Sequence, residues 1–214
     1  METTMQFRSA VTEWAAGAAH AASTARELAV GVQTVVLVEG ASDAAAIEAL
    51  AARMGRTLDA EGVAVVPLGG ATSIGRFLDL LGPAGLGLKL AGLCDAGEER
   101  YFMRGLERVG LGLCSSRTEL RRLGFSVCVA DLEDELIRTL GASSVERIVT
   151  AHGDRRSFRL FQNQPAQRGR SVERQLRRFM GTHSGRKISY ARFLVDGLDL
   201  DHVPAPLGGL LSRV

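Results

Sequence analysis

At 214 residues the chain is long enough for one well-buried core, and 46% of it is hydrophobic while only 5% is aromatic, as in many α/β proteins. The formal net charge is only +2, but acids cluster at 131–135 (DLEDE) while arginines dominate 147–192, which predicts an acidic site beside a surface that meets a polyanion. The three cysteines lack CxxC spacing, which argues against a disulfide framework and a zinc site. No uncharged run reaches membrane-spanning length, which argues against a membrane protein.

Residues 1–30 have alanine-rich helical spacing, and we expect one helix there, packed on the domain or in contact with a partner. Strands and helices then alternate, each strand being a short apolar run and each helix ending near a glycine. In chain order, these strand and helix pairs cover 35–38 and 44–54, 62–68 and 72–81, 88–94 and 98–109, and 125–130 and 131–140. This alternation predicts right-handed βαβ units and a mostly parallel sheet.

The alternation stops at Gly141, and helices and arginine-rich segments follow. Ser143 or Ser144 with Glu146 has the pattern of a capping box, and a helix is expected over 171–180. Lys187 is expected in an exposed loop that precedes a last helix at 190–198, and the tail is expected to form an apolar cover. We therefore divide the chain into an N-terminal helical segment (1–30) and one domain (31–214), with a core at 34–141 and a basic helical extension at 142–214.

Three of the four predicted strands end in acids: Glu39, Asp95 and Asp131. Since the carboxyl ends of parallel strands lie along one edge of a sheet, these side chains are expected to converge. Converging carboxylates repel one another unless a hard divalent cation neutralises them, and Mg²⁺ and Mn²⁺ favour such oxygen ligands. The alternative is that the acids only cap helices, because Asp43, Glu98 and Glu133 each fall in a predicted first turn.

The segment VEGASD after a buried strand, the aspartate at the third strand's end and the D-x-E after the fourth resemble the motifs of a TOPRIM domain. Over about 34–211, the chain is similar to the TOPRIM domain of OLD (overcoming lysogenization defect) nucleases. The resemblance implies a Rossmann-like, four-stranded, mostly parallel sheet flanked by helices, with extra N- and C-terminal helices. It also implies a metal-dependent nuclease.

The resemblance places the family's invariant glutamate at Glu39, as a metal ligand or general base, and a second ligand of the same ion at Asp43. The family's central Asp-x-Asp falls on Asp95-Ala96-Gly97, so the second aspartate is replaced by glycine. Either Glu98 or Glu99 then reaches the metal, or the site is weakened.

The later motifs complete the predicted site. Asp131 and Glu133 match the ligands of a second ion, so the resemblance implies two Mg²⁺ or Mn²⁺ ions per site. Lys187 best matches the family's late lysine, where its charge would stabilise the transition state on the phosphate. From position alone, Lys187 is more simply a solvated charge.

The basic extension offers candidate contacts to the DNA backbone, because arginines supply sequence-independent affinity for phosphates. On one side of the predicted 171–180 helix, arginines recur at i, i+3 and i+4 spacing. The alternative is a solvated helix face. The candidate nucleic-acid-binding residues are Arg155, Arg156, Arg159, Arg170, Arg174 and Arg178.

We therefore expect a cytoplasmic Mg²⁺- or Mn²⁺-dependent DNA endonuclease or nickase. One alternative is a degenerate module that binds DNA or a partner ATPase without catalysis, and another is primase-like nucleotidyl transfer. Full-length OLD proteins carry an ATPase domain ahead of the TOPRIM domain, and none is expected here. A separate ATPase or a second copy of the chain is the predicted protein partner.

Overall fold

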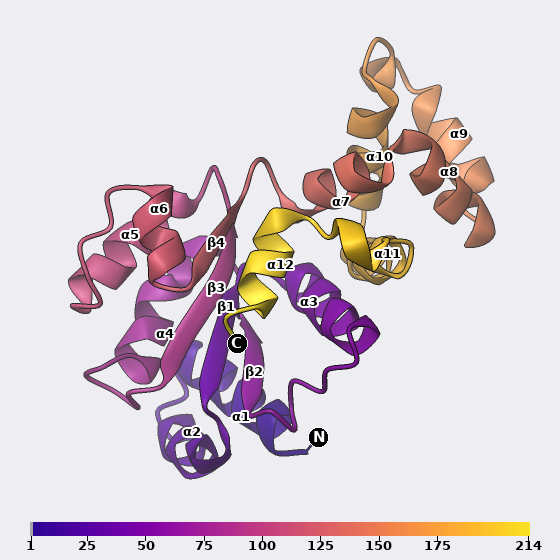
Figure 1. The fold of residues 1–214 in the computed structure, drawn as a ribbon. Coiled ribbons are helices and arrows are strands. Elements are labelled where there is room, and N and C mark those ends of the chain that lie inside the picture. The colour runs from indigo at the N-terminus through magenta and orange to yellow at the C-terminus, as the bar shows by residue number, and fades with distance from the viewer. Residues whose placement is uncertain (1) are drawn as a thin grey trace.

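The computed structural model describes residues 2–214 and contains one four-stranded parallel sheet flanked by helices (Figure 1). The strands are β1 (Thr34–Val38), β2 (Val63–Pro67), β3 (Lys89–Asp95) and β4 (Phe125–Cys128). They lie in the order β2-β1-β3-β4, so β1 and β3 are central. The predicted α/β fold with a parallel sheet is confirmed.

A helix follows each of the four strands, as the alternation in the sequence predicted. Those of the first two thirds of the chain are α1 (Glu2–Ala15), α2 (Ala21–Leu28), α3 (Ala41–Arg53), α4 (Ile74–Leu81), α5 (Glu99–Arg108), α6 (Arg117–Arg122) and α7 (Leu132–Leu140). The remainder are α8 (Ala142–Ala151), α9 (Arg155–Gln162), α10 (Val172–Met180), α11 (Ser184–Asp196) and α12 (Ala205–Leu211). The short helix α6 was not predicted from the sequence.

Strand β1 is buried along its whole length, and its side chains alternate between two hydrophobic cores. Val36 and Val38 face a core formed with α3, α7, α11 and α12. Val35 and Leu37 face the other core, which includes residues of α1, α4, α5 and α6. The uninterrupted apolar run in the sequence therefore reflects a strand covered on both faces.

The N-terminal segment forms two helices instead of the single helix that we predicted. Gly17, with a φ of +107°, lies between α1 and α2, and this backbone conformation breaks the helical run. Phe7 and Val11 of α1 are fully buried in the core that contains Val35 and Leu37. The segment therefore packs on the sheet through α1.

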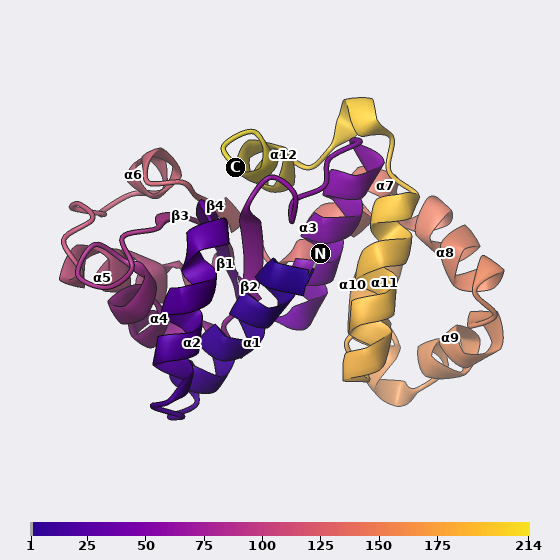
Figure 2. The ribbon, with the colours of Figure 1, turned by 90° about the horizontal axis from the view of Figure 1, so that it is seen from below.

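The extension after Gly141 differs from the prediction in two details. The predicted capping box at Ser143 or Ser144 does not form; Gly141 occupies the N-cap of α8 and no side chain caps the helix. Helix α11 begins at Ser184, so Lys187 lies in its first turn instead of a loop. Helices α8 and α9 lie at the end of the molecule away from the sheet (Figures 1 and 2).

The tail packs against the sheet as expected, because Leu207, Leu210 and Leu211 of α12 are buried and the helix contacts β3 and β4. All three cysteines are free and buried. Within the described part of the chain, no helix is both long enough and apolar enough to cross a membrane.

Candidate metal centre

The carboxyl ends of the two central strands bring Glu39 and Asp95 together. Glu39 follows β1 directly, and Asp95 is the last residue of β3, the neighbouring strand. The backbone N–H of Asp95 donates a hydrogen bond of 2.8 Å to Glu39 Oε1. This contact fixes one oxygen of Glu39 against the tip of the adjacent strand.

Asp43 approaches the same edge from the first turn of α3. Its Oδ2 accepts a hydrogen bond of 2.9 Å from the backbone N–H of Gly40, and its side chain is largely buried. Asp43 therefore stabilises the N-terminus of α3, as the alternative interpretation of the acids as helix caps predicts. This contact orders the turn that also carries Glu39.

Asp131 and Glu133 come from the N-terminus of α7, the helix after β4. Asp131 is the N-cap, and its Oδ1 accepts a hydrogen bond of 2.8 Å from the Asp134 N–H. Its Oδ2 accepts a hydrogen bond of 2.6 Å from Nε of Arg177 on α10 and forms an ion pair with Nη2 of the same side chain, also at 2.6 Å. Glu133 is 3% exposed, and its buried Oε1 has no hydrogen-bond partner in the described structure.

Lys187 supplies the opposite charge to Glu133. Its Nζ lies 3.4 Å from Glu133 Oε1, an ion-pair distance without hydrogen-bond geometry. Burial lowers the pKa of Lys187, but the charges of Glu133 and Asp43 outweigh this and hold the pKa above its ordinary value. The ammonium is therefore firmly charged and belongs to the acidic cluster.

The acids gather closely enough to act on one another electrostatically. Burial raises the pKa of Asp95 to about 8, and the charges of Glu39, Asp43, Asp131 and Glu133 add to this effect. Burial also raises the pKa of Glu39 to about 7, against the lowering effect of its hydrogen bond from Asp95 and with the help of Glu98 and Asp43.

The pKa values of Glu133 and Asp43 are perturbed in the same direction. Burial is again the main cause that raises the pKa of Glu133 to about 7, although Lys187 lowers it. The pKa of Asp43 is raised by burial too, against its hydrogen bond from Gly40 and the charge of Lys187. Shared burial therefore disfavours the full set of negative charges when no cation is bound.

The donor set fits a hard divalent cation, because all its members are carboxylates and one buried oxygen of Glu133 lacks a hydrogen bond. Within residues 2–214, however, no group of three or more Asp, Glu, His or Cys side chains is arranged as a metal site. Asp131 and Glu133 are instead paired with Arg177 and Lys187. The residues thus have suitable chemistry without a preformed coordination shell.

The position of the replaced aspartate, Gly97, is open. A Cβ built on Gly97 would meet no atom within 4 Å, and the backbone there is not in the left-handed region. Glu98 is the N-cap of α5 but makes no capping hydrogen bond with its side chain. Its charge acts on Glu39, so it lies on the same side of the cluster. Glu99 instead pairs with Arg117, at 2.6 Å.

A hollow of about 610 Å³ adjoins the acids on the side of α10 and α11. Its lining comprises Asp131, Glu133, Arg170, Arg174, Arg177, Arg178, Gly181 and Lys187. Three of the predicted nucleic-acid-binding residues are therefore beside the acidic cluster. Five basic side chains against two acids make this hollow attractive to anions.

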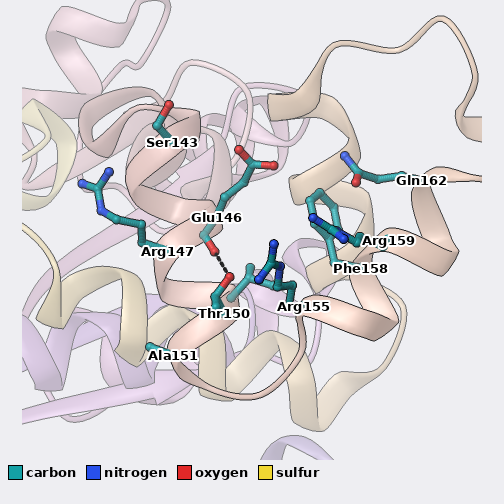
Figure 3. A pocket seen from close by; sticks show the side chains of 10 residues that line it. Ser143, Glu146, Arg147, Thr150, Ala151, Arg155, Phe158, Arg159 and Gln162 are labelled. Atoms are coloured by element: carbon teal, nitrogen blue, oxygen red, sulfur yellow. Dashed lines mark hydrogen bonds between the residues drawn. The ribbon is translucent and has the colours of Figure 1, made fainter.

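The other three predicted arginines are on α9, away from the hollow. Arg155 and Arg159 line a separate pocket of about 560 Å³ between α8 and α9, and Arg156 is exposed on the same helix. Figure 3 shows that pocket, where Arg155, Arg159 and Gln162 of α9 lie across from Glu146 and Thr150 of α8. The six predicted arginines thus form two groups instead of one continuous surface.

Sequence reasoning missed the contact between Arg177 and Asp131. The arginine spacing on the 171–180 helix was visible, but Arg177 is 46 residues from Asp131 and only the packing of α10 against α7 brings them together. The sequence therefore indicated that Arg177 lies on a basic helix face, but it did not indicate which acid this arginine contacts.

Comparison with known proteins agrees with this architecture. Residues 32–96, which include β1, β2, β3, Glu39, Asp43 and Asp95, match the family model of the overcoming lysogenization defect protein-like TOPRIM domain. No curated protein sequence matches the chain.

Solved structures extend the likeness beyond the matched segment. The C-terminal region of the Xanthomonas campestris pv. campestris OLD protein is 22% identical, with a TM-score of 0.68, over 86% of this chain and 92% of that region. The C-terminal region of the Burkholderia pseudomallei OLD protein is 21% identical, with a TM-score of 0.63, over 85% of this chain and 96% of its own. The chain therefore has a segment that matches the OLD-like TOPRIM domain model, and its fold is that of the C-terminal regions of OLD proteins.

Proposed function

We propose that the protein is a Mg²⁺- or Mn²⁺-dependent DNA endonuclease or nickase. The observation that carries this proposal is the cluster of buried carboxylates beside a hollow lined by five basic side chains. A cation among the carboxylates and a phosphate among the basic side chains would each meet groups of opposite charge. The OLD-like TOPRIM segment supports the same choice.

In this proposal Glu39 and Asp43 would hold one divalent ion, with Glu98 as an additional donor in place of the missing aspartate. Asp95, Asp131 and Glu133 would hold or share a second ion. When bound, such ions would activate water and stabilise the leaving oxygen of a phosphodiester. These carboxylates are suitable metal ligands because burial makes their negative charges unfavourable unless a cation neutralises them.

Two side chains have roles of their own at the reacting phosphate. The Lys187 ammonium, held near Glu133 at 3.4 Å, would stabilise negative charge that develops on the phosphate. Glu39, whose pKa is raised to about 7, would accept a proton from water at neutral pH when it is not a ligand. The DNA backbone would contact Arg170, Arg174 and Arg178 next to the reacting phosphate, and the arginines of α9 would make further phosphate contacts.

Nicking of supercoiled plasmid in the presence of Mg²⁺ or Mn²⁺ tests this function. The wild type is expected to convert supercoiled plasmid to open-circle or linear DNA. Glu39→Ala is expected to reduce the rate at least about 100-fold, since one step assisted by a positioned base or ligand contributes that much. Glu61→Ala, which removes an exposed carboxylate paired with Arg56, is the control and should nick at the wild-type rate.

Absence of nicking by the wild type, or equal nicking by Glu39→Ala, would contradict the proposal. The glycine at position 97 favours one other function, a degenerate module that binds DNA or a partner ATPase without cleavage. Calorimetric titration with Mn²⁺ separates the two, because a degenerate module should show no metal binding that depends on Glu39 and Asp43.

A further inference from the structure

We propose that Arg177 is exchanged between Asp131 and the DNA backbone, so that DNA binding frees Asp131 for the second divalent ion. This inference rests on the proposed function and assigns a regulatory role to a residue of the same site. Without DNA, Arg177 holds Asp131 and only the Glu39 side of the cluster is ready for a cation. With DNA, a phosphate takes the guanidinium and Asp131 becomes a ligand.

Arg177 contacts the oxygen of Asp131 that the helix cap leaves free. Asp131 Oδ1 accepts the hydrogen bond from the Asp134 N–H as the cap of α7, and Oδ2 makes no part of this cap. Both Nε and Nη2 of Arg177 lie 2.6 Å from Oδ2. A cation at Oδ2 would therefore meet the positive charge of Arg177 unless the guanidinium moved.

The two sides of the acidic cluster differ in charge compensation. Asp131 and Glu133 each have a basic partner within 4.0 Å, Arg177 and Lys187 respectively. Within residues 2–214, no ion pair with a basic side chain is found for Glu39, Asp43, Asp95 or Glu98. On the Glu39 side, Lys187 acts on Asp43 only through its charge, and an incoming cation has no ion pair to displace there.

Arg177 is placed to leave Asp131 when a phosphate arrives. Its side chain is 42% exposed and lines the anion-attracting hollow together with Arg170, Arg174 and Arg178. An ion pair whose basic partner is partly exposed contributes little net stability, so a competing anion can replace the carboxylate. A guanidinium binds two phosphate oxygens as well as it binds a carboxylate, which makes the DNA backbone a suitable competitor.

Counting bound Mn²⁺ by equilibrium dialysis tests the proposal without measuring cleavage. In the absence of DNA, Arg177→Gln is expected to bind one Mn²⁺ ion per chain more than the wild type. Arg192→Gln is the control, because Arg192 is an exposed arginine of α11 that lies outside the lining of the hollow and has no role in the proposed site. Its Mn²⁺ count should equal that of the wild type, and circular dichroism confirms that both variants are folded.

A second titration adds a duplex with phosphorothioate linkages, which resist cleavage, and subtracts the Mn²⁺ bound by the duplex alone. The wild type is expected to gain one ion per chain, whereas Arg177→Gln should gain none. Equal counts for the wild type and Arg177→Gln without DNA, or a wild type whose count the duplex does not change, would overturn the proposal. Failure of plasmid nicking alone would overturn the nuclease function and leave these counts as a separate result.

Discussion

Gly97 is the residue at which this chain departs most clearly from the Asp-x-Asp pattern that its resemblance implies. The structure has room for the missing carboxylate, since a Cβ at this position would meet no atom within 4 Å. The backbone there also needs no left-handed conformation, which an aspartate would strain. The loss of this ligand is therefore a property of one side chain, and the surrounding loop is compatible with its return.

Gly97→Asp is accordingly expected to strengthen Mn²⁺ binding by about tenfold, because one added carboxylate donor is expected to contribute about 1.4 kcal/mol. Isothermal titration calorimetry measures the change directly. Gly97→Asn is the matched control, since it has the same size and lacks the charge, and it should bind Mn²⁺ close to the wild-type affinity. An unchanged affinity in Gly97→Asp would show that the side chain at 97 does not reach the ion.

At the level of single residues, the sequence predicted the acids far better than their partners. VEGASD was informative because Glu39 and Asp43 are fixed by local structure, one after a buried strand and the other in the first turn of α3. Arg177 was not assigned to Asp131, since a contact across 46 residues depends on how α10 packs against α7. Local pattern thus predicts the ligands, whereas tertiary packing decides which of them are neutralised.

For whole elements too, local sequence pattern predicted some features, whereas others depended on tertiary packing. Apolar runs such as 35–38 predicted β1 and the parallel sheet, because a strand buried on both faces has no polar positions. The first turn of α11 was missed because Gly181 and Gly185 indicate a loop, and the extent of the helix follows from its packing on α3. The strand order β2-β1-β3-β4 was not predicted, since the crossover lengths alone permit several orders.

Helix α1 is an integral part of the domain's core, and this can be tested within the helix itself. Phe7 is fully buried while Met5, two residues earlier, is 63% exposed. Phe7→Ala should destabilise the protein by about 3–5 kcal/mol, because it leaves a cavity under the sheet. At about 2–4 °C per kcal/mol, the melting temperature should fall by roughly 6 °C or more.

Met5→Ala is the control for that measurement and should change the free energy of unfolding by less than about 0.5 kcal/mol. Thermal unfolding followed by circular dichroism distinguishes the two variants. If Phe7→Ala melts at the wild-type temperature, α1 contributes no stability to the fold, and its contact with the sheet is incidental.

For the molecule as a whole, the uneven charge distribution means that stability and metal binding are linked. The acids lie between the carboxyl ends of the strands and α7, and the basic side chains of the hollow lie on α10, α11 and the turn before α10. Without a cation, the acidic side has more negative charge than its own partners neutralise. We therefore expect the metal-free protein to respond to pH in the direction opposite to that of most proteins with salt-bridged carboxylates.

The direction follows from the raised pKa values. Glu39 and Glu133 have pKa values of about 7 against an ordinary value of 4.5, and Asp95 has a pKa of about 8 against 3.8. Between these values the folded protein holds protons that the unfolded chain has lost, so the free energy of unfolding decreases as pH rises. In EDTA, the melting temperature should therefore fall between about pH 5 and pH 8 by at least about 5 °C, because even one such group changes the free energy of unfolding by about 3 kcal/mol over two pH units.

Saturating Mg²⁺ should flatten this dependence, because the ion replaces the protons that stabilise the acidic cluster at low pH. Asp95→Asn, which keeps the shape of the protonated acid, should also make it shallower in EDTA. Differential scanning calorimetry at several pH values measures both effects. A melting temperature that rises steadily from pH 5 to pH 8 in EDTA would mean that the acids are already neutralised by Lys187 and the arginines, and that burial does not favour their protonated forms.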